Sequence, residues 1–252
     1  FLRHHDWIVN HALRRPEALA AIDLGNGARF TYRDFHRRID GIAVWLADAA
    51  GVGAGDRVAV LAHASVDVFA IQFACFRLGA IFVPLNVRLA APELLAILAN
   101  CTPTALLHDA AFADLAGDAA PAGGPTRLIS IGADSAFAKA AGGAERPAVQ
   151  AELGLHDVAT ILYTSGTTGL PKGVKVTHAM NLFNAVNVTG LAEITDRSVH
   201  LCILPLFHTA GLNVYSNPVF HAGCAVVVMP DWSDTTGLTV NFIIVATSCR
   251  FS

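Results

Sequence analysis

The sequence has few of the residues that build disulfide-linked or metal-bound frameworks. Its five cysteines are scattered over 252 residues and form no Cys-x-x-Cys pair, which disfavours a disulfide framework or a zinc site. Most of them lie in apolar stretches, so we expect buried, inert thiols in a reducing cytoplasm. The cysteines are Cys75, Cys101, Cys202, Cys224 and Cys249.

The sequence also lacks a strong charge of one sign and a long hydrophobic run. The net charge of −3 gives no global field to attract nucleic acid or an anionic membrane, so any anion site must be local. The longest apolar-leaning runs, such as residues 238–246, are too short to form a transmembrane segment. The first residues, FLRHHDW, do not continue into the apolar segment of a secretory signal. We therefore expect a globular protein of the cytoplasm.

The apolar residues, 54% of the chain, are enough for a sizeable core and follow the periods of helices and strands. Thr31 with Asp34 resembles a capping box, and apolar residues then recur at helical spacing, which predicts a helix over 31–50. A glycine-rich turn over 51–56 leads into a buried strand over 57–62. The apolar residues at helical spacing are Phe35, Ile39, Ile42 and Leu46.

Strands and helices alternate along the rest of the chain. Residues 109–150 are rich in Ala, Gly and Pro and are predicted to be a variable connection with one strand at 128–131. The alternation is typical of an α/β fold with mostly parallel sheets flanked by helices. Strands are predicted over 81–83, 105–108, 158–163, 174–177, 199–204 and 225–229, and helices over 65–78, over 92–100, from about 179 and up to about 220.

One stretch concentrates polar chemistry: residues 163–178 read YTSGTTGLPKGVKVTH. Its glycines allow backbone N–H groups to converge on one point, because glycine tolerates positive φ angles. Hydroxyl groups can donate to phosphate oxygens or ligate a hard cation such as Mg²⁺, and Lys172 adds a charge that can follow a polyphosphate. A flexible surface hairpin would explain the glycines and the proline, but not the density of hydroxyl groups or the lysine. The hydroxyl residues are Thr164, Ser165, Thr167, Thr168 and Thr177.

Three better-known motifs do not fit these loops. A Walker A loop starting at Gly166 would need a glycine where Pro171 stands. A nucleophile elbow around Ser165 would need glycines at the positions of Tyr163 and Thr167. The glycine-rich turn over 51–56 precedes a strand, whereas a dinucleotide-binding loop follows one.

The residues ILYTSGTTGLPK at 161–172, followed by Gly-Val and by Thr-His at 177–178, resemble the signature of the adenylate-forming superfamily. That superfamily comprises acyl-CoA synthetases, luciferases and peptide-synthetase adenylation domains. Residues 204–213, LPLFHTAGLN, are similar to its second core motif, and the runs starting at Gly55 and Gly79 resemble its N-terminal region. The resemblance extends from about residue 11 to about residue 234.

The resemblance implies a reaction in two steps with ATP, Mg²⁺ and coenzyme A. A carboxylate, expected to be a fatty or hydrophobic aromatic acid by family analogy alone, attacks the α-phosphate of ATP to give an acyl-adenylate and pyrophosphate. The thiol of coenzyme A then takes the acyl group. This reaction needs stabilisation of the negative charge on the departing pyrophosphate. Hydrogen-bond donors in a fixed geometry, a metal ion and a lysine provide it.

The resemblance also implies the roles of single residues. Lys172 and His208 are implied to be catalytic, His208 lining the acyl pocket, and Thr167 or Thr168 to lie nearest the metal. The alternatives are that Thr164 only caps a strand end, that Lys172 is a solvated turn residue and that His208 only packs a loop, but within a complete motif the functional roles are favoured. His178, which would open the next helix, fits a structural cap or a neighbour of the nucleotide. The implied phosphate loop comprises Thr164, Ser165, Gly166, Thr167, Thr168, Gly169 and Lys172.

The sequence departs from the family pattern after Asp234. Residues 235–252 do not resemble the family, and the Tyr-Gly-x-Thr-Glu segment, the ribose-binding acid, the metal-binding glutamate, the hinge and the C-terminal domain with its lysine are absent. We therefore expect residues 1–234 to be a partial large N-terminal domain of an adenylate-forming enzyme, which leaves catalysis by this chain uncertain. The expected state is an incomplete, inactive fragment of an acid–CoA ligase. A nucleotide-binding module without turnover and a non-functional gene remnant are the alternatives.

Overall fold

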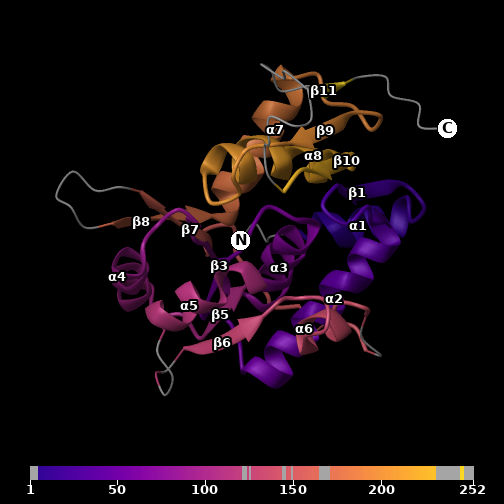
Figure 1. The fold of residues 1–252 in the computed structure, drawn as a ribbon. Helices are drawn as coiled ribbons and strands as arrows, with labels where there is room; N and C mark the ends of the chain where they lie inside the picture. Colours follow the sequence, from indigo (N-terminus) through magenta and orange to yellow (C-terminus); the bar gives the residue numbers. More distant parts are fainter. Residues whose placement is uncertain are drawn as a thin grey trace. The chain divides into compact units, whose positions relative to one another are not determined.

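The computed structural model describes residues 5–120, 124, 126–143, 146–148, 150–164 and 171–230, and the backbone of 245–246. These residues form two compact units, whose elements are labelled in Figure 1. The first unit holds residues 37–63 and 68–178. The second holds residues 5–36 and 64–67 and the chain from 179 onward.

The first unit is built on a six-stranded sheet with the order β6-β5-β3-β4-β7-β8. Every neighbouring pair is parallel except β7 and β8, which are antiparallel. A mostly parallel sheet needs helical crossovers between its strands, and the sequence supplies them. The strands are β3 (Arg57–Leu61), β4 (Ile81–Pro84), β5 (Ala105–His108), β6 (Arg127–Ser130), β7 (Val158–Thr164) and β8 (Lys172–Thr177).

Helices flank this sheet, as predicted (Figure 1). Buried side chains such as Leu94, Ile97 and Leu98 of one helix pack against Val83 and Leu106 of the sheet in a single apolar cluster. The helices are α2 (Tyr32–Ala50) and α3 (Val66–Leu78), which begin in the second unit, α4 (Ala91–Cys101), the 3₁₀ turn η1 (Ala110–Phe112), α5 (Ala113–Ala119) and α6 (Ala136–Ala140).

The second unit contains a five-stranded sheet with the order β11-β9-β10-β1-β2. Its central pairs β9–β10 and β10–β1 are parallel, and the outer pairs are antiparallel. The strands are β1 (Leu19–Asp23), β2 (Arg29–Thr31), β9 (Val199–Cys202), β10 (Ala225–Val228) and β11 (Val245–Ala246). The helices are α1 (Trp7–Arg14), α7 (His178–Leu191), which starts at the end of the first unit, the π-helical segment η2 (Ala210–Ser216) and α8 (Asn217–Ala222).

The predicted start of the 31–50 helix is confirmed in atomic detail. The Thr31 hydroxyl donates to Asp34 Oδ2 at 2.6 Å, and the Asp34 amide donates to Thr31 Oγ1 at 3.2 Å. The Thr31 amide also donates to Asp34 Oδ2 at 3.3 Å, so the amides of Thr31 and Asp34, two backbone donors at the helix N-terminus, both have side-chain acceptors. The turn after the helix is also confirmed, since Gly51 and Gly55 have φ angles of 70° and 81°, a region that favours glycine.

The prediction for residues 109–150 is wrong in part, because they also contain η1, α5 and α6. These helices are too short for a hydrophobic period to stand out. Phe137, which is fully buried, fixes α6, and Ser135 caps it by accepting from the Ala138 amide at 3.1 Å. The atypical region 235–252 lies outside the described residues except for 245–246.

Two expectations from composition concern buried thiols and membrane spans. Cys75, Cys101, Cys202 and Cys224 are buried and free of disulfide bonds, as predicted, whereas Cys249 lies outside the described residues. In the described part of the chain, no helix combines the length and the apolar character that crossing a membrane requires.

Candidate functional site

The predicted phosphate loop joins β7 and β8, which form an antiparallel hairpin (Figure 1). Five of its seven predicted residues, Ser165, Gly166, Thr167, Thr168 and Gly169, lie outside the described residues. The structure places the other two, Thr164 as the last residue of β7 and Lys172 as the first of β8. The hairpin therefore defines where the loop leaves the sheet and where it returns.

Thr164 and Lys172 are direct cross-strand partners. Residues directly opposite in an antiparallel pair lie on one face of the sheet with their Cβ atoms roughly 5 Å apart. Both are exposed, so a hydroxyl and an ammonium group stand side by side at the mouth of the loop. This part of the donor set fits an anionic phosphate chain, which needs hydrogen-bond donors and a positive charge.

The position of β7 in the sheet also suits a ligand site. β7 pairs in parallel with β4, with Phe82 opposite Thr160, so the loop starts at the carboxyl end of a parallel strand. Ligands of open α/β sheets bind at that edge. The antiparallel return strand β8 then leads straight into α7 at His178.

His178 is part of the packing beneath the hairpin. Its side chain is buried, and its ring lies edge-on to Phe76 with the ring centroids 4.9 Å apart. Its amide donates to the Asp157 carbonyl at 3.1 Å. Of the two roles left open by the sequence, the structural one accounts for these contacts.

His208 lies in the second unit, on the loop between β9 and η2. Its amide donates to the Pro205 carbonyl and its carbonyl accepts from the Leu212 amide, both at 3.2 Å. The side chain is exposed, with its ring centroid 4.6 Å from that of Phe207. The loop backbone is therefore fixed, while the imidazole is accessible to a ligand.

The shape of this loop depends on Gly211, which sequence reasoning did not single out. A Cβ atom at this position would lie 2.5 Å from the Pro205 carbonyl oxygen and 2.7 Å from that of Leu204, so a side chain cannot be accommodated without moving the backbone. The Gly211 carbonyl accepts from Ser216 Oγ at 2.6 Å across the π-helical segment. Such π-helical segments occur frequently at functional sites.

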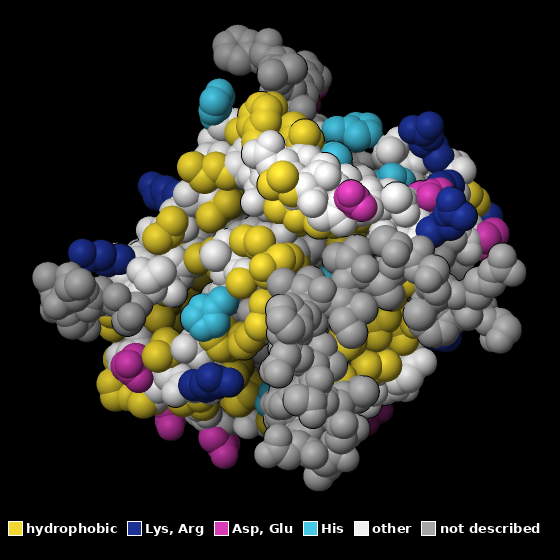
Figure 2. Space-filling view, turned by 90° about the horizontal axis from the view of Figure 1, so that it is seen from above, with side chains coloured by type: hydrophobic (Ala, Val, Ile, Leu, Met, Phe, Trp, Pro, Cys, Tyr) yellow, Lys and Arg dark blue, Asp and Glu magenta, His cyan; other side chains and the backbone are white. Residues whose placement is uncertain are grey.

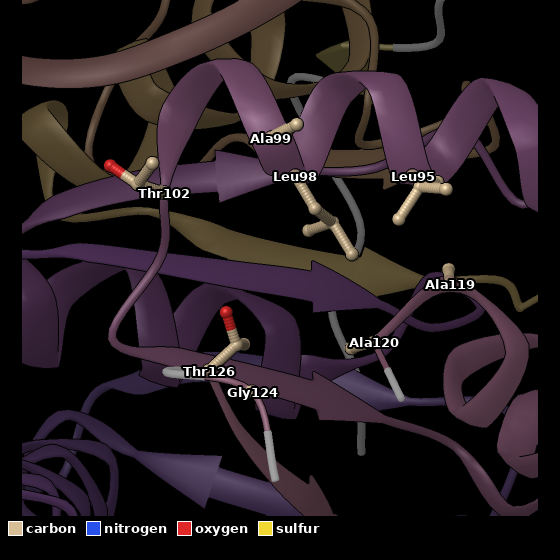
Figure 3. Close-up of a pocket in the computed structure, with 8 residues that line it drawn as sticks. All are labelled: Leu95, Leu98, Ala99, Thr102, Ala119, Ala120, Gly124 and Thr126. Carbon is tan, nitrogen blue, oxygen red and sulfur yellow. The ribbon is translucent and has the colours of Figure 1, made fainter. Parts of the chain in front are cut away.

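An apolar cavity of roughly 210 Å³ lies elsewhere in the first unit, between α4 and the chain that leads into β6. Figure 3 shows Leu98 pointing into it, with Ala99 and the two threonines at its wall. No titratable side chain and none of the predicted site residues lines it, so it has no evident chemistry. The lining residues are Leu95, Leu98, Ala99, Thr102, Ala119, Ala120, Gly124 and Thr126.

Among the described residues, no group of three or more His, Cys, Asp or Glu side chains lies close enough together to hold a metal ion. Thr167 and Thr168, the predicted neighbours of Mg²⁺, lie outside the described residues. Their role therefore stays a prediction.

Comparison with protein families identifies a match across most of the chain. The family described as AMP-binding enzyme matches residues 8–246. This range covers the hairpin and the loop with His208, and it agrees with the resemblance that the two motifs indicated.

Named relatives and solved structures point the same way. The chain is 36% identical over 222 residues to a feruloyl-CoA synthase from Amycolatopsis sp, covering 88% of this chain and 43% of that protein. It is 32% identical over 240 residues to the long-chain-fatty-acid–CoA ligase FadD13 from Mycobacterium tuberculosis, covering 93% and 46%. ATP-bound MatB from Rhodopseudomonas palustris superposes with a TM-score of 0.81 at 28% identity, covering 92% and 46%. The chain thus spans less than half the length of these proteins.

Proposed function

Because the chain belongs to the family of AMP-binding enzymes, we propose that it forms the triphosphate-binding part of an acid–CoA ligase. The observation that carries this proposal is the pairing of Thr164 with Lys172 at the mouth of the loop. A hydroxyl and an ammonium group on one face suit the β- and γ-phosphates of ATP. The proposed location is the cytoplasm, where ATP and coenzyme A are available.

In the proposed reaction, a carboxylate oxygen attacks the α-phosphorus of ATP. The bond between the α-phosphorus and the bridging oxygen breaks, and pyrophosphate leaves with the electron pair. The coenzyme A thiolate then attacks the acyl carbon of the acyl-adenylate, and AMP leaves. Neither step needs an oxidant or a covalent bond to the protein.

The proposed role of this chain's residues in that reaction is to stabilise the negative charge of the phosphates. In this proposal the Lys172 ammonium binds the phosphates that depart as pyrophosphate, and the glycine-rich sequence of residues 165–169 is expected to add backbone donors. The hydroxyl of Thr167 or Thr168 would help to hold Mg²⁺, which when bound would neutralise charge on the phosphate oxygens. The ring of His208 is exposed, and its proposed role is to contact the acyl group.

The proposed substrate is a hydrophobic carboxylic acid, either aromatic or fatty. The support is the naming of two relatives, a feruloyl-CoA synthase and a long-chain-fatty-acid–CoA ligase. For the 252-residue chain itself we propose weak binding of MgATP without turnover, because the chain spans less than half the length of these relatives and a partial site supplies only part of the contacts.

Calorimetric titration with MgATP and with inorganic tripolyphosphate tests the binding proposal. Lys172→Gln should lower the affinity for each of the two ligands by about tenfold, because a charge-assisted hydrogen bond is lost. Lys139→Gln, a matched change on α6 away from the loop, should leave both unchanged. Equal binding by wild type and Lys172→Gln would contradict the proposal.

Carboxylate-dependent exchange of pyrophosphate into ATP tests the proposed lack of turnover. The expected result for the chain alone is no exchange with ferulate, medium-chain or long-chain acids, even where ATP raises the melting temperature. Clear exchange with any of these acids would show that the chain catalyses adenylation and would overturn that part of the proposal.

A further inference from the structure

The base of the hairpin contains an unusual pair, Tyr163 opposite Gly173. This pair is adjacent to the pair of Thr164 and Lys172, one step further from the loop. Successive residues of a strand point to opposite faces. Tyr163 therefore lies on the face opposite to Thr164 and Lys172, where it can act on the loop only through the backbone.

The Tyr163 side chain covers Gly173 closely. A Cβ atom on Gly173 would lie 2.9 Å from Ile161 Cγ2, 3.2 Å from Tyr163 Cζ and 3.3 Å from the Tyr163 hydroxyl oxygen. An aromatic ring that lies across a glycine on the facing strand stabilises an antiparallel pair that would otherwise lack side-chain contact. The ring also packs against the apolar cluster of the first unit.

The Tyr163 hydroxyl ties this strand to a helix. It donates to Asn100 Oδ1 at 2.6 Å, a short bond between β7 and the last turn of α4. Burial raises the pKa of the Tyr163 hydroxyl, and the neighbouring Cys101 adds to the rise. The hydroxyl therefore stays protonated and keeps its role as donor to Asn100.

The register of this hairpin decides where Lys172 points. A slip of one residue would move every side chain of β8 to the other face of the sheet. Lys172 would then lie on the side of Tyr163, away from Thr164 and the mouth of the loop. The glycine contact and the hydroxyl bond both oppose such a slip, because both depend on Tyr163 standing opposite Gly173.

We infer that Tyr163 is a positioning residue that, with Gly173 and Asn100, fixes the register of the hairpin and so holds Lys172 opposite Thr164. The consequence for phosphate binding rests on the proposed function, whereas the register itself does not. Tyr163 does not touch the phosphates in this arrangement and acts through Lys172.

Hydrogen–deuterium exchange on the whole chain tests the register. Tyr163→Phe and Asn100→Ala should speed exchange of the amides in β7 and β8 by about two- to tenfold, the effect of losing one hydrogen bond. Asn100→Asp keeps an acceptor for the Tyr163 hydroxyl, so its amides should exchange at the wild-type rates. Amides of α2 are the internal control and should not change. Wild-type rates in both Tyr163→Phe and Asn100→Ala would overturn the inference.

A double-mutant cycle on MgATP affinity separates positioning from a general loss of structure. Asn100→Ala should weaken binding in the wild-type background and have no further effect in a Lys172→Gln background, because it acts through the lysine. If Asn100→Ala lowered the MgATP affinity by the same factor in both backgrounds, the inference would be overturned. If the wild type does not bind MgATP at all while the exchange results appear as expected, the proposed function fails and the register assignment stands.

Discussion

The hairpin of β7 and β8 and the loop that carries His208 hold their side chains by different means. In the hairpin, strand register places Thr164 beside Lys172, and the atoms that crowd Gly173 belong to side chains. In the segment that carries His208, Gly211 lies against two backbone carbonyls, and among the described residues no strand pairs with this segment. A site held by register tolerates small adjustments, whereas a site held by a backbone contact does not.

The largest expected effect comes from Gly211→Ala. The new methyl group would meet the carbonyl oxygens of Leu204 and Pro205, which cannot move without the loop, so we expect a loss of about 3 kcal/mol in unfolding free energy. Urea denaturation followed by tryptophan fluorescence measures it. An unchanged unfolding free energy would show that this loop adjusts as easily as the hairpin, which would contradict the difference between the two regions.

The second-largest effect is expected from acid, which should lower the unfolding free energy of the second unit. Burial lowers the pKa of His200 to about 4, below its unfolded value of about 6.5, so the unfolded chain binds more protons between these values and stability falls as pH falls through this window. From about pH 7.5 to about pH 5 the loss is about 2 kcal/mol.

His200→Leu should remove that share of the pH dependence while keeping a buried apolar side chain. Burial also lowers the pKa values of His11 and His221 in the same unit, so part of the pH dependence should remain. Urea denaturation of both proteins at several pH values gives the difference. Identical slopes would contradict the assignment to His200.

Gly173→Ala should cost less than Gly211→Ala, about 1 kcal/mol. Its methyl group meets Ile161 Cγ2 and the Tyr163 ring, which can shift by a few tenths of an ångström. The same urea titration compares the two alanine variants directly. A larger loss for Gly173→Ala than for Gly211→Ala would reverse the contrast between the two regions.

The smallest effect is expected on α7, which follows the hairpin. Phe183 is 58% exposed, and Figure 2 shows apolar side chains at several places on the surface it displays. Phe183→Ser should change the unfolding free energy by less than about 0.5 kcal/mol. A loss above about 2 kcal/mol in the same assay would contradict this expectation and show that the exposed Phe183 side chain contributes to packing.

The two strands of the hairpin were predictable from the sequence because their signals are local, whereas their antiparallel pairing was not predicted. Apolar runs on either side of a glycine-rich loop predict two strands, and Thr31 with Asp34 likewise predicts a capped helix start. The structure extends the predicted strands by only a few residues, to Thr164 and from Lys172. Thr164 and Lys172, which the sequence placed in the loop, are therefore the strand residues that border it, and their roles stay a prediction.

The roles of Tyr163 and Gly211 were not predictable in the same way. Tyr163 bonds to Asn100, 63 positions earlier in the chain, and no local pattern predicts that contact. Gly211 matters because the chain folds back on Pro205, which a glycine in a loop motif does not reveal. The strand β1 is likewise defined by pairing with β10, about 200 residues later, so its short sequence contains little signal of its own.

β8 is the last strand in the order of the six-stranded sheet, next to β7 alone among the described strands. Its outer backbone groups can serve as a template for another chain, and lysines on such strands suppress aggregation. Lys172 and Lys175 both lie on β8. We therefore expect Lys172 to contribute to colloidal stability as well. Light scattering of Lys175→Gln beside Lys172→Gln would separate a loss of solubility from a loss of phosphate binding.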